Sequence, residues 1–123
     1  MRASFFLAGL AAAALSGAAA AQTPTGEYSG ALSRMISQAA AGTCAPDVMG
    51  DQLLAACNQQ ITQMASGLQS LGPIESVTFL RAEDTPQGRM EFYSVRFTGG
   101  MTLTWFIGAR QPDGKFQAAG TGG

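Results

Sequence analysis

The sequence predicts an α+β domain in which two N-terminal helices pack on one face of a three- to four-stranded antiparallel meander. Two stretches, 27–41 and 51–71, repeat apolar residues at intervals of three and four, as amphipathic helices do. Later stretches alternate apolar and polar residues, as half-buried strands do, and turns rich in Gly, Pro and Asp separate them. These predicted strands are 74–81, 90–97, 101–108 and 115–119. Because the helices precede the strands instead of alternating with them, we expect an antiparallel sheet.

The first 21 residues are predicted to be a signal peptide and not a part of the fold. Arg2 precedes an apolar run at 5–15, and the small residues at 16–21 suit a signal peptidase. We place cleavage after Ala21, with the Ala20/Ala21 bond as the second choice. The run is too short and too rich in Ala for a spanning helix, which needs about 20 strongly apolar residues. We therefore expect a periplasmic or secreted protein, with residues 22–123 as one domain whose ordered part is about 27–119.

The first helix is predicted over 27–41. Its apolar positions are Tyr28, Leu32, Met35, Ile36 and Ala39. Glu27 suits the opening turn, where the helix dipole favours a negative charge, and Gly42 suits the end of the helix.

Cys44 and Cys57 are the only cysteines, and an isolated pair in an oxidising compartment usually forms a disulfide. The bridge would close a loop of roughly 14 residues and stabilise the fold by about 3 kcal/mol on the chain-entropy model. A redox or metal-binding pair is the alternative, but the chain has no Cys-x-x-Cys spacing and no His. A second helix starting at Asp47 would carry Cys57 about 15 Å along its axis, too far for an easy bridge to Cys44. We therefore expect this helix over 51–71, ending before Gly72-Pro73.

The pattern of side chains in the hairpin over 90–108 predicts how its two strands pair. A two-residue loop at Gly99-Gly100 would mix apolar and polar residues on each face, whereas a three-residue loop at 98–100 gives one consistently apolar face. The members of that face are Tyr93, Val95, Phe97, Met101, Leu103, Trp105 and Ile107. We expect the helices to cover it.

The opposite face of the hairpin carries an aromatic pair, Phe92 and Phe106, beside Arg96 and small polar residues. Such a mixed, exposed surface could pair with a second copy of the chain, which would make the protein a homodimer. A solvated face with one aromatic pair is the alternative.

Composition argues against several classes of function. The formal net charge is −1, and the chain lacks the clustered Lys and Arg that nucleic-acid binding needs. With no His, it cannot form a Ser-His-Asp or Cys-His site or a His-based metal site, and it has no Gly-rich phosphate loop. We expect no catalytic residues, no metal, no cofactor and no membrane span after cleavage.

Five short motifs stand out together, and they are Leu71-Gly72-Pro73-Ile74-Glu75-Ser76-Val77-Thr78-Phe79, Tyr93-Ser94-Val95-Arg96-Phe97, Gly100, Trp105-Phe106-Ile107 and Asp113-Gly114-Lys115. They resemble a small exported bacterial domain of the cystatin-like and nuclear-transport-factor-like α+β group. That domain is often found beside serine hydrolases of the β-lactamase type. The resemblance covers about 47–117, and the chain departs from it in the Cys44/Cys57 pair and in lacking an attached hydrolase. It implies an accessory or binding module.

The candidate ligand-binding residues are Tyr93 and Trp105, which pair across strands. Sheets of this group curve around a pocket, so these rings would meet a small apolar molecule there. The alternative is that they simply fill the core beneath the helices. A protein partner that binds through the sheet is the other binding mode.

The same group includes ketosteroid isomerase, which suggests a cavity enzyme as the alternative function. Such a site uses a carboxylate base beside a Tyr donor. By strand alternation Glu91 shares the face of Tyr93, but at the start of its strand we expect it in solvent. A buried carboxylate with a raised pKa inside a cavity would favour the enzyme. A cystatin-like inhibitor role is disfavoured because the Gln-x-Val-x-Gly hairpin tip is absent.

Overall fold

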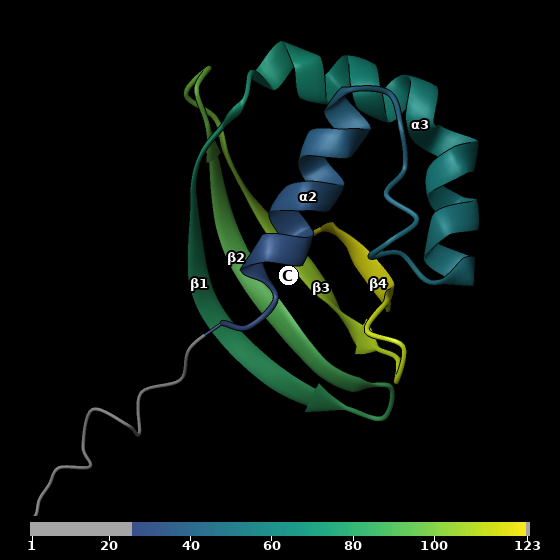
Figure 1. Ribbon diagram of the computed structural model, residues 1–123. Helices are drawn as coiled ribbons and strands as arrows, with labels where there is room; N and C mark the ends of the chain where they lie inside the picture. Colours follow the sequence, from purple (N-terminus) through teal and green to yellow (C-terminus); the bar gives the residue numbers. More distant parts are fainter. Residues whose placement is uncertain (1–25, 123) are drawn as a thin grey trace, which may run out of the picture.

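The computed structural model describes residues 26–122, and it confirms the predicted α+β class. The predicted signal peptide and its cleavage site lie outside this range. The elements are α2 (Ser29–Ala40), α3 (Asp51–Leu71), β1 (Ile74–Thr85), β2 (Gly88–Phe97), β3 (Thr102–Arg110) and β4 (Phe116–Thr121). The strands form one antiparallel sheet in the order β1-β2-β3-β4, and both helices contact it (Figure 1).

The sheet curves around α2, which lies along its concave face (Figure 1). One cause of the curvature is in β1, where the register with β2 shifts between Phe79 and Arg81. This bulge leaves Leu80 without a partner and 46% exposed. Bulges bend a strand and increase its twist, so β1 wraps toward the helix. Above α2, α3 bends so that one part stands beside β4 and the rest crosses over α2 (Figure 1).

The two helices differ in how fully they are buried. In α2 the predicted apolar stripe is covered, with Leu32, Met35, Ile36 and Ala39 all buried. In α3, which starts and ends where we expected, only Cys57, Ala65 and Leu68 are buried. The other stripe residues, among them Leu53 and Met64, remain partly exposed. A helix that bends away from the sheet leaves space beneath its apolar side.

The predicted register of the central hairpin is confirmed. Tyr93 lies opposite Trp105, Val95 lies opposite Leu103, and the Phe97 amide donates to the Met101 carbonyl at 2.9 Å across the three-residue loop. Gly100 adopts a φ of 102°, a backbone conformation that glycine adopts readily and other residues rarely do, which explains why glycine stands at this position. Met101 was wrongly expected under the helices: it is 52% exposed, because the loop extends beyond their cover.

The other strands are longer than predicted. The residues expected as a polar turn, 82–89, continue the β1–β2 ladder, with Glu83 opposite Met90 and Asp84 opposite Arg89, so only Pro86 and Gln87 remain in the turn. Strand pairing depends on backbone hydrogen bonds, so polar side chains that face solvent did not end the strand. Likewise β4 reaches Thr121 instead of ending at 119, because Gly120 and Thr121 pair with β3.

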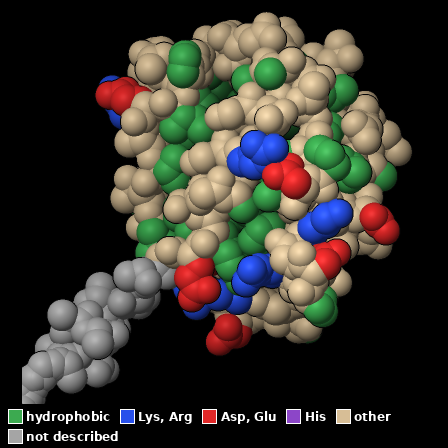
Figure 2. Space-filling view, viewed as in Figure 1, with side chains coloured by type: hydrophobic (Ala, Val, Ile, Leu, Met, Phe, Trp, Pro, Cys, Tyr) green, Lys and Arg blue, Asp and Glu red, His purple; other side chains and the backbone are tan. Residues whose placement is uncertain are grey.

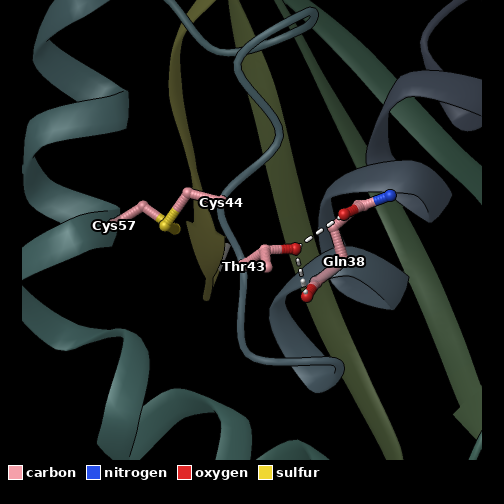
Figure 3. The surroundings of a disulfide bond; sticks show 4 residues. All are labelled: Gln38, Thr43, Cys44 and Cys57. Carbon is pink, nitrogen blue, oxygen red and sulfur yellow. Dashed lines mark hydrogen bonds between the residues drawn. A yellow bond between two sulfur atoms is a disulfide. The ribbon is translucent and has the colours of Figure 1, made fainter.

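The Cys44–Cys57 disulfide is confirmed, with the two Cα atoms 6.0 Å apart (Figure 3). It joins the loop between the helices to α3. On the other side of the loop, the Thr43 hydroxyl donates to Oε1 of Gln38 on α2 at 2.7 Å (Figure 3). The end of the loop also bonds to β4, since the Phe116 amide donates to the Val48 carbonyl at 2.9 Å. The loop therefore ties both helices to the sheet edge.

Candidate functional site

A cavity of about 310 Å³ lies between α2, α3 and the paired ends of β3 and β4. Its lining residues are Leu32, Met35, Ile36, Ala39, Met49, Leu53, Ala56, Cys57, Gln60, Met64, Leu68, Trp105, Ala119, Gly120 and Thr121. Apolar side chains dominate this set, and none of the lining residues is charged. Figure 2, in the same view as Figure 1, shows hydrophobic side chains in recesses of the surface. We call this space the first cavity.

Gln60 and Thr121 are the polar residues of the lining apart from the indole, and both are exposed. They lie on α3 and at the end of β4. The lining of the first cavity is therefore mostly apolar, with two exposed polar residues. Clefts that bind small molecules usually have this distribution, with a mostly apolar wall and a few polar groups that fix orientation.

Trp105 contributes an unusual group to the cavity wall. Its side chain is 8% exposed, and its Nε1 atom is buried without a hydrogen-bond partner among the described residues. The indole N–H can only donate, and leaving a buried donor unpaired costs about 1–3 kcal/mol. Buried polar groups are rarely left in this state. Trp105 also lines the first cavity, so the unpaired donor belongs to a residue of the cavity wall, although the Nε1 atom itself is covered by protein atoms.

The other candidate ligand residue, Tyr93, does not line the first cavity. It is opposite Trp105 in the sheet, but its ring packs edge-on against Phe79 with the centroids 5.6 Å apart, and it is 1% exposed. Its hydroxyl is so close to Gly26 that a Cβ there would lie 2.2 Å from the oxygen. The structure thus separates the two predicted residues: Trp105 lies at the cavity and Tyr93 lies in the filled core.

The position of Glu91 corrects our expectation. We predicted a carboxylate in solvent, but the residue is 0% exposed. Four donors surround it: the Glu27 amide at 3.0 Å, the Tyr28 amide at 3.0 Å, the Tyr93 hydroxyl at 2.5 Å and Nε of Arg89 at 2.7 Å. We call this group the carboxylate clasp. The first two donors stand immediately before α2, so β2 holds the start of the helix.

The electrostatics of the clasp keep Glu91 ionised. Burial by itself raises the pKa of this carboxyl, but the hydrogen bonds from Tyr93, Arg89 and the two amides together lower it below its ordinary value. The partners respond in the expected sense: burial and the bond to Glu91 raise the pKa of Tyr93, and the same carboxylate raises the pKa of Arg89. Glu91 is not among the residues of the first cavity. An isomerase site would need a buried carboxylate with a raised pKa. Glu91 is buried, but its pKa is lowered, so it does not meet this criterion.

On the other face of the sheet, the predicted surface residues are partly covered. Phe92 is only 9% exposed, because the guanidinium of Arg81 lies 4.0 Å from its ring centroid. Arg96 is exposed, and its Nε lies 3.2 Å from Oε1 of Glu75. Phe106 is partly buried beside Gly120, whose added Cβ would lie 3.2 Å from the ring. The mixed, exposed surface predicted for this face is thus partly covered by Arg81.

Within residues 26–122, no three His, Cys, Asp or Glu side chains come together as a metal site. In the same residues, no helix combines the length and the apolar character needed to cross a membrane.

Sequence reasoning missed the clasp and the unpaired indole because remote segments determine the surroundings of both side chains. The amide donors of the clasp lie 63 or 64 positions away from Glu91, and no local pattern reports such a pairing. Strand alternation did place Glu91 and Tyr93 on one face of the sheet, and this shared face was the sequence signal that the two side chains could lie close together.

Comparison with known proteins adds no relative. No family model matches the chain, and neither the curated proteins nor the solved structures include one with significant similarity to it. The chain is therefore described by its architecture, an α+β fold of two helices followed by a four-stranded antiparallel meander.

Proposed function

We propose that this domain binds a small, largely apolar molecule in the first cavity, without catalysing a reaction. The observation that carries the proposal is the unpaired Nε1–H of Trp105, a residue that lines this largely apolar cavity. A small rotation of the indole would bring this N–H to the cavity surface, where a ligand acceptor would pair with it while the apolar part of the ligand fills the space.

The size of the cavity limits the ligand. An apolar cavity of about 150 Å³ holds a benzene molecule, so a space of this kind twice as large accommodates roughly ten to fifteen non-hydrogen atoms. The volume of 310 Å³ is in that range. The domain therefore suits a ligand such as a medium-chain ester or ketone better than a large cofactor.

The charge of the lining favours an uncharged ligand. None of the lining residues is an Asp, Glu, Lys or Arg, so a ligand charge inside the cavity would be desolvated without a partner. A neutral carbonyl or ether oxygen pays a smaller desolvation cost and still accepts from the indole N–H.

We further propose that the domain is an exported accessory module, periplasmic or secreted, of the small bacterial group whose motifs its sequence resembles. The signal-peptide pattern of residues 1–21 and the Cys44–Cys57 disulfide support export. Expression with the native N-terminus in a bacterial host tests this: we expect the periplasmic fraction to contain a chain beginning at Gln22. A full-length chain in the cytoplasm would contradict it.

A protein partner or a second copy on the outer sheet face remains the alternative binding mode. Arg81 covers Phe92 there, so the face offers less apolar area than the sequence suggested. The specific observation at Trp105 therefore favours the first cavity.

Calorimetry and fluorescence with methyl octanoate test the proposed function. Trp105 is the only tryptophan, so its emission should change on binding, and calorimetry should show one site. Trp105→Phe keeps an aromatic ring, although a smaller one, and removes the N–H, and we expect about tenfold weaker binding because a hydrogen bond contributes about 1 kcal/mol or more. Phe106→Leu, on the opposite face of the same strand, is the matched control and should bind normally. If methyl octanoate does not bind, or Trp105→Phe binds as tightly as the wild type, the proposal fails.

A further inference from the structure

We infer that the ligand is an elongated, uncharged chain whose apolar end passes between Ile36 and Leu68 into a second hollow. This inference rests on the proposed function, because it concerns the molecule held in the first cavity.

The second hollow has a volume of about 410 Å³ and lies where the end of α2, the end of α3 and the start of β1 meet. Its lining residues are Ile36, Ser37, Ala40, Ala41, Leu68, Gln69, Gly72, Pro73, Ile74 and Phe97. Like the first cavity, it has no charged residue in its lining. It can therefore accept an apolar segment but offers no partner for a charged one.

Ile36 and Leu68 are the two residues that line both spaces. Ile36 belongs to α2 and Leu68 to α3, and their exposed fractions are 3% and 6%. The two spaces thus lie on either side of one pair of aliphatic side chains. This pair is therefore the partition through which the inferred ligand would pass.

The narrow gap between the two spaces favours a narrow ligand. Two spaces joined through a gap between two side chains accept an unbranched chain, which is narrow, more readily than a fused ring. Rotation about the side-chain bonds of Ile36 and Leu68 opens the partition, and the methylenes of the ligand replace the lost contacts. With an acceptor at Trp105 and a tail beyond the partition, the class is a neutral acyl-chain compound such as a fatty ester or a long-chain ketone.

A homologous series of methyl octanoate, dodecanoate and hexadecanoate tests this inference by competition calorimetry. We expect affinity to keep rising after the first cavity is full, with up to about a fourfold gain for each methylene that becomes buried. Ala40→Leu fills part of the second hollow, so it should abolish the gain of hexadecanoate over octanoate and leave octanoate binding unchanged. Ser33→Leu, on α2 but lining neither space, is the matched control and should keep the full gain.

The outcomes separate the two proposals. If octanoate binds and the longer esters bind no more tightly, the inference is wrong and the proposed function stands. If no ester binds, both fail. Thermal unfolding establishes that Ala40→Leu is folded, and Ser37→Leu, which lines the same hollow, provides a second variant with the same expected loss. Retention of the full gain in the folded variants would also overturn the inference.

Discussion

The hydroxyl of Tyr93 donates a hydrogen bond of 2.5 Å to Oε1 of Glu91, two residues earlier on the same strand. Both side chains point to the concave face of the sheet, and the same carboxylate oxygen accepts the amide of Tyr28 at 3.0 Å. A single acidic side chain on β2 therefore satisfies backbone donors that precede α2. Since α2 forms one wall of the first cavity, the clasp fixes the wall from outside the cavity.

Replacing Glu91 should destabilise the fold. In Glu91→Gln the side chain keeps its shape but loses its charge, and its amide nitrogen faces donors instead of accepting from them. Hydrogen bonds to charged groups contribute about 1.5–3 kcal/mol, so we expect a loss of about that size in the free energy of unfolding. Urea unfolding of the wild type and the variant measures it.

Glu83→Gln is the control for this substitution. Glu83 pairs with Arg81 at 3.0 Å, but its side chain is 51% exposed. Exposed ion pairs contribute about 0–1 kcal/mol, so the control should unfold nearly as the wild type does. Equal losses in the two variants would contradict the structural role of the clasp.

Stability should depend on pH through the same carboxylate. Because the folded pKa of Glu91 is held below its ordinary value of 4.5, the unfolded chain binds the proton more readily. The stabilisation is therefore complete above pH 4.5 and is lost as the pH falls through the lower folded value. We expect the difference in unfolding free energy between wild type and Glu91→Gln to shrink between pH 7 and pH 3. A difference that stays constant would show that the charge of Glu91 is not responsible.

The disulfide should stabilise the folded domain, in which Cys57 also lines the first cavity. Its removal in a Cys44→Ala/Cys57→Ala double variant should cost about 3 kcal/mol on the chain-entropy model for a loop of roughly this length. Thermal unfolding with and without a reducing agent measures the effect. The wild type should respond to the reductant and the double variant should not. A wild type that melts identically in both conditions would contradict the prediction.

Two glycines should respond in opposite directions to substitution by alanine. At Gly26 a Cβ would lie 2.2 Å from the Tyr93 hydroxyl oxygen and 2.8 Å from the Phe79 ring. We expect Gly26→Ala to destabilise by about 1–3 kcal/mol, the usual cost of overpacking a core. Gly67 is exposed within α3 and a Cβ there would meet nothing within 4 Å.

Gly67→Ala should therefore stabilise the protein by about 0.5–1 kcal/mol, because alanine loses less backbone entropy in a helix. Denaturant unfolding of both variants checks the pair. Stabilisation by Gly26→Ala would show that the chain does not pack against Tyr93 as described.

Several features could be predicted because they depend on neighbouring residues. The spacing of Leu32, Met35 and Ile36 identified α2 and its buried side. The alternation around Gly100 identified the hairpin register, since a shift by one residue would have turned every apolar side chain outward. The two cysteines identified both the disulfide and the start of α3.

Other features could not be predicted because distant segments determine them. Arg81 covers Phe92 only because a bulge at Leu80 alters which side chains of β1 face outward. The first cavity exists because α3 bends above α2, and the helical periodicity of 51–71 carries no signal of that bend.

The sequence by itself determined the order of helices and strands, the register of the central hairpin and the pairing of Cys44 with Cys57. These follow from backbone periodicity and the chemistry of neighbouring side chains. The tertiary structure alone decided that Glu91 is buried and that the Trp105 N–H is left without a partner. Burial and hydrogen-bond satisfaction depend on which remote segments surround a side chain, so the same strand pattern is compatible with a carboxylate in solvent or in the clasp.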